Sequence, residues 1–377
     1  MNQGIYIHIP FCVKKCFYCD FASAAGSIAD MEAYIEALCK EIAVTRQKQV
    51  PVDTVYIGGG TPTSLPLFLL QKLLLAVKRA FPLKADTEYT VEANPGTVDM
   101  EKLRLLRGQG VNRISLGVQS FQNRLLKTCG RIHTGADALQ AVHSIKEAGF
   151  ENCSLDLIYG LPGQSLEDLK ESIEIALAQN IQHISIYGLQ VEENTVFFEK
   201  QEAGTLVLPG EDAAEEMYDY LCTVLPKRGY FRYEISNFAR PGFESQHNLR
   251  YWKNLPYLGL GAAAHSYDGT CRWENYADRQ TYIEAMHCHG QAVLEEHVLT
   301  TQEKMEEFCF LALRTRDGIS ALAFQQLFGC TLAAVYGEKI IQMEQQGLLA
   351  CKEQRIFLTT EGMKFGNRVF MEFLLDK

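Results

Sequence analysis

The stretch Ile5-Tyr-Ile-His-Ile-Pro-Phe-Cys-Val-Lys-Lys-Cys-Phe-Tyr-Cys-Asp20 decides the fold of this 377-residue chain. It places Cys12, Cys16 and Cys19 in a C-x3-C-x2-C pattern, directly after an apolar run that predicts a strand. Thiolates are the usual ligands of iron–sulfur clusters. Three cysteines leave one iron of a 4Fe–4S cluster open, much as catalytic zinc sites keep one position open. The stretch therefore predicts a cluster whose open iron takes a cofactor or substrate.

A zinc site is the main alternative for the same cysteines. Structural zinc sites are closed by four ligands, and the obvious local candidate for the fourth is His8, which lies within the predicted strand. Three cysteines without a shared function are the remaining interpretation, and their close spacing at a strand end disfavours it. The cluster is the preferred interpretation.

Outward from this stretch, strand and helix patterns alternate through the first two-thirds of the chain. Short apolar runs predict strands at Ile5–Ile9, Thr54–Ile57, Glu88–Glu92, Arg113–Val118, Asn152–Ile158 and His183–Leu189. Apolar residues at three- and four-residue steps predict helices at about Asp30–Arg46, Pro66–Phe81, Asp99–Gln109, Gly135–Ala148 and Leu166–Gln179, with Asp30 and Ser165 as N-caps. Repeated βα units predict a parallel sheet with right-handed crossovers, and six units match a partial (β/α)6 barrel.

The polar motifs follow these strands in a regular way. The cysteine loop, Gly58–Pro62, Glu92–Pro95, Gln119 and Asp156 all fall at or just after the C-terminal ends of predicted strands. In β/α barrels that rim holds the active site. Five segments far apart in sequence are therefore expected to converge on one face of the barrel.

Six motifs occur in order along the chain: Pro10-Phe-Cys12, Tyr18-Cys-Asp-Phe21, Gly58-Gly-Gly-Thr-Pro62, Glu92-Ala-Asn-Pro95, Gly117-Val-Gln-Ser-Phe121 and Asp156-Leu-Ile-Tyr-Gly-Leu-Pro162. Together they resemble the radical S-adenosylmethionine (SAM) superfamily. Within it they resemble the family of oxygen-independent coproporphyrinogen III dehydrogenases and their heme-chaperone relatives. The resemblance spans essentially the whole chain. It implies a partial barrel of radical SAM type, a 4Fe–4S cluster on Cys12, Cys16 and Cys19, and bound SAM, which a reduced cluster would cleave.

The resemblance also implies which residues hold the cofactors. It assigns to SAM the residues Tyr6, Gly59, Gly60, Thr61, Glu92, Gln119, Arg131 and Asp156, and Tyr18 joins the cofactor-binding set. We expect Arg131 to pair with a carboxylate, because its planar fork suits that geometry. Asp156 is expected to accept ribose hydroxyls, by analogy with the acidic residue of dinucleotide folds. No residue is assigned a catalytic role.

Two functions compete within this family: oxidative decarboxylation of coproporphyrinogen III, and binding of heme for transfer to an acceptor hemoprotein. The second is favoured, because the dehydrogenases carry an N-terminal extension and this chain begins a few residues before its first strand. Asp20-Phe21 also follows Cys19, where the dehydrogenases have a further cysteine two residues on. His247-Asn-Leu-Arg-Tyr-Trp252 matches the H-N-x-x-Y-W motif of the heme chaperones. A radical SAM enzyme acting on another substrate is the third possibility.

His247 is the first candidate for a heme ligand, because histidine is a common axial ligand of heme iron. Tyr251 and Trp252 are expected to offer aromatic faces to the porphyrin at the barrel mouth. Without the resemblance, His247 would be read as a hydrogen-bonded structural histidine. His265, in Gly261-Ala-Ala-Ala-His-Ser266, is the reserve candidate.

The alternation ends near Pro209, which predicts three units: a barrel with the cluster and SAM site (1–208), a connecting region with the His247–Trp252 motif (209–300), and a C-terminal α+β domain (301–377). In the last unit, helices at Gln302–Arg314, Ile319–Phe328 and Ala334–Gln346 precede a hairpin of Leu348–Ala350 and Arg355–Leu358, which predicts a winged-helix-like domain. Its wing offers only Lys352 and Arg355 to DNA, so a lid or packing role is expected.

Composition narrows the class of protein. Apolar residues at 47% and charged residues at 22% are ordinary for a globular chain. A formal net charge of -10 disfavours a nucleic-acid partner held by electrostatics. Twelve cysteines without a visible secretory signal or membrane-spanning run indicate reduced thiols and a cytoplasmic location. Peripheral membrane association and a homodimer are both compatible with this composition.

Overall fold

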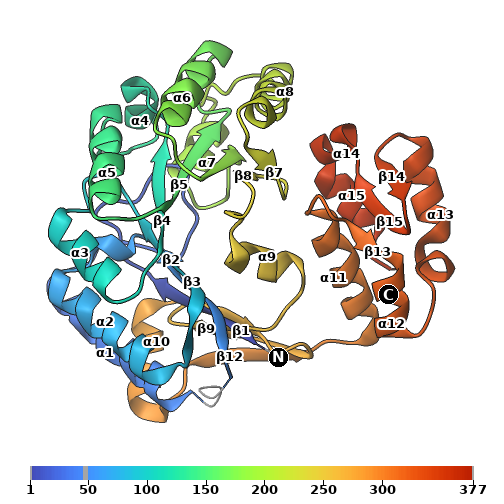
Figure 1. Cartoon of the computed structure of the whole chain (residues 1–377). Coiled ribbons are helices and arrows are strands. Elements are labelled where there is room, and N and C mark those ends of the chain that lie inside the picture. Colours follow the sequence, from blue (N-terminus) through green and yellow to red (C-terminus); the bar gives the residue numbers. More distant parts are fainter. Residues whose placement is uncertain (1, 46–49, 376–377) are drawn as a thin grey trace.

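The fold is built around a curved sheet whose central strands come from the first half of the chain (Figure 1). The computed structural model describes residues 2–45 and 50–375, so Arg46, the predicted end of the first helix, lies outside the described residues. Six parallel strands lie side by side in chain order: β1 (Gln3–Ile9), β2 (Val52–Gly59), β3 (Leu83–Ala93), β4 (Arg113–Gln119), β5 (Asn152–Tyr159) and β6 (His183–Gly188). This confirms the predicted partial (β/α)6 barrel.

Helices connect these strands and cover the outer face of the sheet (Figure 1). They are α1 (Ile28–Val44), α2 (Leu67–Ala80), α3 (Met100–Gly108), α5 (Gly135–Glu147) and α6 (Leu166–Ala178), with the short α4 (Asn123–Thr128) and the 3-10 turn η1 (Pro62–Ser64) between them. The five longer helices lie where the apolar periodicity predicts them. η1 and α4 were not predicted from the sequence, because each is less than two turns long and shows too little of the apolar periodicity.

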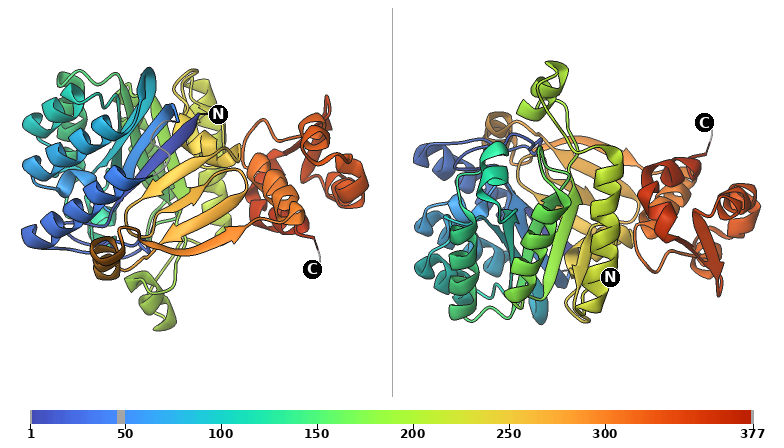
Figure 2. Two further views of the ribbon diagram at one scale, coloured as in Figure 1. Left: turned by 90° about the horizontal axis from the view of Figure 1, so that it is seen from below. Right: turned by 90° about the horizontal axis from the view of Figure 1, so that it is seen from above.

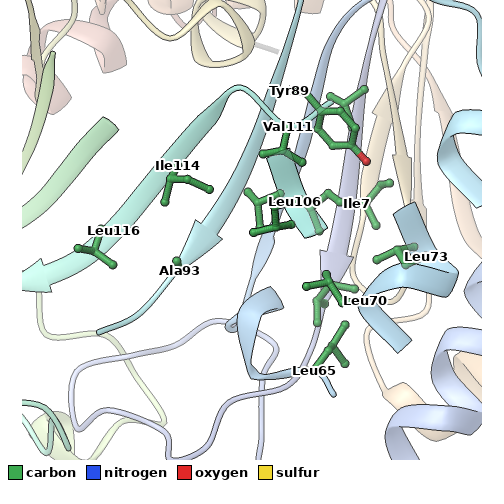
Figure 3. Close-up of a cluster of buried hydrophobic side chains, with 14 of the residues drawn as sticks. Ile7, Leu65, Leu70, Leu73, Tyr89, Ala93, Leu106, Val111, Ile114 and Leu116 are labelled. Atoms are coloured by element: carbon green, nitrogen blue, oxygen red, sulfur yellow. The ribbon is translucent and has the colours of Figure 1, made fainter. Parts of the chain in front are cut away.

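The two faces of the strands differ in chemistry. On β1, Ile5, Ile7 and Ile9 are fully buried beneath the helices, while Tyr6 and His8 between them face the inside of the barrel. The outward set continues on the neighbouring elements, and Figure 3 shows it packing as one core. Each such Ile or Leu contributes about 1.5–3 kcal/mol when fully buried. Burial of the outward residues therefore fixes the register that turns the polar residues inward.

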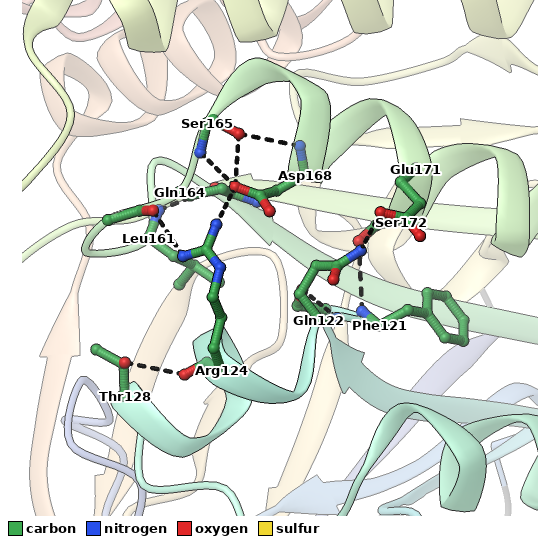
Figure 4. A network of polar contacts seen from close by, with 12 residues as sticks. Phe121, Gln122, Arg124, Thr128, Leu161, Gln164, Ser165, Asp168, Glu171 and Ser172 are labelled. Atoms are coloured by element: carbon green, nitrogen blue, oxygen red, sulfur yellow. Dashed lines mark hydrogen bonds and ion pairs between the residues drawn. The ribbon is translucent and has the colours of Figure 1, made fainter.

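Helix starts are fixed by polar caps. Ser165 accepts a hydrogen bond from the backbone N of Asp168, whose carboxylate in turn accepts from the backbone N of Ser165, and Figure 4 shows Arg124 of α4 pairing with the same carboxylate. This confirms the predicted cap of α6. The prediction for α1 is wrong: the N-cap is Ser27, and Asp30 is the acidic partner three residues later in the same capping box. The Ser-x-x-Asp spacing carries that signal.

The segment after β6 extends the same sheet at both edges. After α7 (Val196–Glu202) and α8 (Glu211–Lys227), the strand β8 (Asn237–Ala239) adds antiparallel to β6, and β7 (Phe231–Arg232) adds antiparallel to β8. After α9 (Gln246–Trp252), the strand β9 (Tyr257–Leu260) pairs parallel with β1, and β10 (His265–Tyr267), β11 (Cys271–Asn275) and β12 (Val293–Val298) follow, with α10 (Arg279–His289) before β12. The division at 208 and 300 stays a prediction.

The C-terminal part has its own core beside the barrel (Figure 2). Its elements are α11 (Thr301–Leu313), β13 (Ile319–Ser320), α12 (Ala321–Phe328), α13 (Leu332–Gln345), β14 (Leu349–Lys352), β15 (Arg355–Leu358), α14 (Thr360–Lys364) and α15 (Gly366–Glu372). The small sheet has the order β13-β15-β14, with β14 and β15 forming the predicted hairpin. Buried residues of this core include Leu313, Phe324 and Tyr336. The predicted α+β domain with winged-helix character is confirmed.

Helix α11 joins this domain to the barrel. Glu307 accepts two hydrogen bonds from Arg272 of β11, both 2.8 Å long. The guanidinium of Arg314, which follows α11, lies 4.4 Å from the ring centre of Trp252 on α9. These contacts place α11 against the open side of the sheet. Within the described part of the chain, no helix is both long and apolar enough to cross a membrane.

Candidate functional site

The cysteine loop connects β1 to α1 at the C-terminal rim of the barrel. Its backbone is tied down by hydrogen bonds from Cys12 N to Ala24 O (3.1 Å) and from Phe17 N to Cys129 O (3.0 Å). Cys12, Cys16 and Cys19 are all half-buried, and all three line one cavity of about 400 Å³. The predicted convergence of the thiols on the rim is therefore present.

The donor set fits an iron–sulfur cluster. Cys16 Sγ lies 3.3 Å from Nη1 of Arg131, and Cys12 Sγ lies 3.6 Å from Oγ1 of Thr61. Cysteine binds metal as the thiolate, and Arg131 supplies a positive charge beside Cys16. No three His, Cys, Asp or Glu side chains of the described residues meet as ligands of one metal ion. Cluster thiolates bind separate irons, so they need to surround a space, and these three do.

The residues assigned to SAM, with the exception of Tyr6, are brought together at the C-terminal rim of the barrel. The same cavity is lined by Tyr18, Gly59, Gly60, Thr61, Glu92, Gln119, Arg131 and Asp156. Gly60 sits where the chain passes closest to the cysteine loop, because a Cβ there would meet the carbonyl oxygen of Phe11 at 2.6 Å. A glycine is required at that crossing, which gives the Gly58–Pro62 motif a physical reason.

Arg131 is held in place by several acceptors around it. Its Nη2 donates to the Gly117 carbonyl at 2.5 Å and to Oδ1 of Asn94. Asn94 in turn donates from Nδ2 to Oγ1 of Thr61 at 2.6 Å. This chain links the Glu92–Pro95 motif to the Gly58–Pro62 motif and to the cluster loop. The predicted pairing of Arg131 with a ligand carboxylate stays a prediction.

Two half-buried carboxyl groups line the inner wall of this cavity. Glu92 accepts from Tyr56 Oη at 2.7 Å and from Gly59 N at 3.0 Å, and burial together with the charge of Asp156 raises its pKa to about 7. Asp156 accepts from Ser115 Oγ at 3.0 Å, and burial raises its pKa as well. Two carboxyl groups of raised pKa in a cleft are typical of a functional site.

A second cavity of about 570 Å³ adjoins the first and is lined mainly by aromatic side chains. The two cavities share Phe21, Gly59 and Glu92. The remaining walls come from β1, the cysteine loop, β9, β10 and the turn between them, β11, α9 and α11: Tyr6, His8, Ala22, Tyr251, Trp252, Tyr257, Ala263, His265, Arg272 and Leu311. Tyr6, assigned to SAM by the resemblance, therefore lies in the wall of this second cavity.

His247 lines neither cavity. It is 1% exposed, and both of its ring nitrogens are engaged: Nδ1 lies 2.8 Å from Thr54 Oγ1, and Nε2 lies 2.8 Å from Tyr251 Oη. Burial, with Arg250 and Arg113 nearby, lowers its pKa to about 3, so the ring is neutral. In this structure the histidine of the His247–Trp252 motif braces α9 against β2. Tyr251 and Trp252 of the same motif do reach the second cavity.

Asn94 and Arg113 are among the residues of the first cavity that were not predicted from the sequence. Asn94 lies inside the Glu92–Pro95 motif, but its role emerges only from its contacts with Arg131 and Thr61. Arg113 is 1% exposed, and its Nε and Nη1 have no hydrogen-bond partner among the residues described. An arginine opening an apolar strand is the signal that would have found it, since buried charge is rare without a purpose.

Comparisons with known proteins agree with this architecture. Residues 6–176 match the model of the radical SAM superfamily, and residues 299–365 match the HemN C-terminal domain. Heme chaperone HemW from Lactococcus lactis is 43% identical over 99% of this chain and 98% of its own length. Heme chaperone HemW from Bacillus subtilis is 41% identical over 99% of both chains.

A solved structure shows the same fold. Coproporphyrinogen III oxidase (HemN) from Escherichia coli, described as a radical SAM enzyme, superposes with a TM-score of 0.88 over 99% of this chain and 90% of its own. Because the two sequences are 24% identical, this match shows only that the fold is shared. The identity to the heme chaperones extends over nearly the whole length of both partners, and the chain belongs to the HemW family of the radical SAM superfamily.

Proposed function

We propose that this protein is a heme chaperone, which binds heme and transfers it to an acceptor hemoprotein. The observation that carries the proposal is the aromatic cavity of about 570 Å³ that shares Glu92, Gly59 and Phe21 with the cysteine-lined cavity. Pockets of roughly 300–1,000 Å³ with mostly apolar walls are typical of small-molecule and cofactor sites. The relatives of 43% and 41% identity that bear the name heme chaperone support the same function.

Membership of the radical SAM superfamily implies a 4Fe–4S cluster and SAM. We assign the cluster to Cys12, Cys16 and Cys19, and SAM to the other residues that line the same cavity. The cluster, when bound and reduced, supplies the electron for SAM cleavage. The residues of this chain bind and orient: Gly60 keeps the backbone close to the cysteine loop, Arg131 provides a cation beside Cys16, and Asp156 offers an acceptor for hydroxyl groups.

The position of the C-terminal domain supports a role in holding the ligand. Leu311 of α11 forms part of the wall of the aromatic cavity. Glu307 on the same helix accepts a hydrogen bond from Arg272, which also lines that cavity. The predicted lid or packing role suits this placement. Three expectations remain predictions: that Tyr6 binds SAM, that the protein forms a homodimer, and that it contacts a membrane peripherally.

The deciding experiment is anaerobic reconstitution of the cluster, followed by two parallel measurements. One portion is titrated with hemin and followed by absorbance, and the other is incubated with coproporphyrinogen III, SAM and a reductant. Stoichiometric heme binding without protoporphyrinogen formation is the expected result. Turnover of coproporphyrinogen without heme affinity would instead make the protein a dehydrogenase. In the same preparation Cys16→Ser should lose the cluster absorbance, whereas Cys288→Ser on the exposed end of α10 should keep it.

A further inference from the structure

The walls of the aromatic cavity contain few groups able to ligate heme iron. Histidine, cysteine, methionine and tyrosine are the usual axial ligands. Among the lining residues these types are represented by His8 and His265 and by three tyrosines, Tyr6, Tyr251 and Tyr257. The phenol oxygens of Tyr251 and Tyr257 are engaged with His247 Nε2 at 2.8 Å and with Arg272 Nη1 at 3.0 Å. Tyr6 Oη lies 3.0 Å from Nδ1 of His8.

His8 is already used at both ring nitrogens. Its Nδ1 faces Tyr6, and its Nε2 lies 2.9 Å from the carbonyl oxygen of Ala22, so the ring ties β1 to the cysteine loop. His247 stands behind the cavity wall with both nitrogens bonded. For either ring to bind iron, the hydrogen bond at the coordinating nitrogen would have to break, and the buried partner left without it would be costly.

His265 is different in each of these respects. Its side chain is 63% exposed, and its Nδ1 lies 3.3 Å from Oε2 of Glu274 on the neighbouring strand β11. Among the described residues, Nε2 of His265 has no hydrogen-bond partner. A carboxylate beside Nδ1 favours the tautomer with the proton on that nitrogen, which leaves the Nε2 lone pair free. Metal-binding histidines are commonly oriented in this way by a carboxylate.

The backbone around His265 is rigidly placed. Gly259 of β9 lies directly against it, and a Cβ at that position would collide with the carbonyl group of His265. Ser266 Oγ accepts from Gly259 N at 2.9 Å, and the buried carboxyl of Glu41 accepts from Gly261 N at 2.8 Å and from Asn275 Nδ2 at 2.7 Å. The Gly-rich segment before His265 therefore packs tightly, so that the backbone of β10 holds His265 at the edge of the cavity.

We infer that His265 is the axial heme ligand of this protein, binding iron through Nε2, and that Glu274 is its positioning residue. The inference rests on the proposed heme-chaperone function and adds the ligand to it. Neutral imidazole coordinates without losing a proton, because Nδ1 keeps its hydrogen toward Glu274. Tyr251, Trp252 and Tyr257 then supply apolar faces around the porphyrin.

The test is a hemin titration of the reconstituted full-length protein, with absorbance and electron paramagnetic resonance as readouts. His265→Ala should lower heme affinity at least tenfold and remove the histidine signature, and added imidazole should restore that signature. Glu274→Gln should keep heme bound but raise its reduction potential, because a weaker acceptor at Nδ1 makes the imidazole a poorer donor. The matched control is His143→Ala on the outer helix α5, where the side chain is 74% exposed, and it should change neither readout.

The possible results distinguish a wrong ligand assignment from a wrong proposed function. If His265→Ala keeps the affinity and spectrum of the wild type while a folded His247→Gln loses them, the ligand is His247 and the inference is wrong, whereas the chaperone function stands. If both variants bind heme like the wild type, the ligand lies elsewhere and the inference is again wrong. If the wild-type protein binds no heme at all, the inference and the proposed function fail together. Circular dichroism of each variant establishes that it is folded.

Discussion

Glu92 illustrates how the barrel interior sets the charge of its own residues. Its carboxyl ordinarily titrates near 4.5, and burial with the neighbouring Asp156 raises its pKa to about 7, against the hydrogen bonds from Tyr56 and Gly59. The folded state therefore holds this proton more tightly than the unfolded chain does. The contribution of Glu92 to the free energy of unfolding is fully present below about pH 4.5 and is lost as the pH rises to about 7.

This linkage predicts a pH-dependent effect of Glu92→Gln in the cluster-free protein. Relative to the wild type, the free energy of unfolding of the variant should rise by about 3 kcal/mol between pH 4.5 and 7, because the shift is roughly 2.5 pKa units and each is about 1.4 kcal/mol. Urea denaturation at several pH values measures the difference. Glu151→Gln, exposed at the start of β5, is the control and should run parallel to the wild type. A parallel curve for Glu92→Gln would mean that folding does not raise the pKa of this carboxyl.

Helix caps are the clearest case of local sequence deciding an element. Four helices, α1, α5, α6 and α11, begin with a serine or threonine whose partner three residues later is acidic, and in each the capping box is complete. For α6 the box also anchors α4, since Asp168 accepts from Ser165 and pairs with Arg124 (Figure 4).

Removing the cap of α6 should cost about 1 kcal/mol of stability. Ser165→Ala leaves the backbone N of Asp168 without its acceptor and removes the hydroxyl donor to the Asp168 carboxylate, which keeps the backbone N of residue 165 as its other donor. The midpoint of urea unfolding should fall accordingly, and amide hydrogen exchange should rise in the first turn of α6. Ser144→Ala, in the interior of α5, should be neutral or slightly stabilising, because alanine has the higher helix propensity. Equal effects of the two substitutions would contradict the capping role.

The central strands could be predicted from sequence because each is a short apolar run between helices, and the positions of the motifs at strand ends placed the first cavity. The outer strands could not be predicted in this way. β9 pairs with β1 across some 250 residues of chain, and its residues Tyr257–Leu260 include a glycine and lack any local signal of that partner. Tyr251 and Trp252 were expected beside the porphyrin, but the other walls of the aromatic cavity were not predicted, because they come from elements that no local pattern connects.

The molecule as a whole places its two cores on either side of the aromatic cavity. The barrel core supplies β1, β9 and β10, and the C-terminal core supplies α11 with Leu311. Between them, Arg272 bonds Glu307, Asn254 and Tyr257 at once, and the guanidinium lies 4.4 Å from the ring centre of Tyr267. The wall of the cavity is therefore completed only while α11 stays docked on the sheet.

Weakening this contact should loosen the C-terminal domain and speed heme release. Glu307→Gln keeps the shape of the side chain but removes the charge that pairs with Arg272, and hydrogen bonds to charged groups are worth about 1.5–3 kcal/mol. Amide exchange should increase in α11 and α9, and heme should dissociate several-fold faster to an acceptor such as apomyoglobin. Glu338→Gln, exposed on α13, should change neither rate. If Glu307→Gln raises exchange in α11 but leaves heme dissociation unchanged, the domain packs against the barrel without closing the cavity, because release then does not depend on the docking of α11.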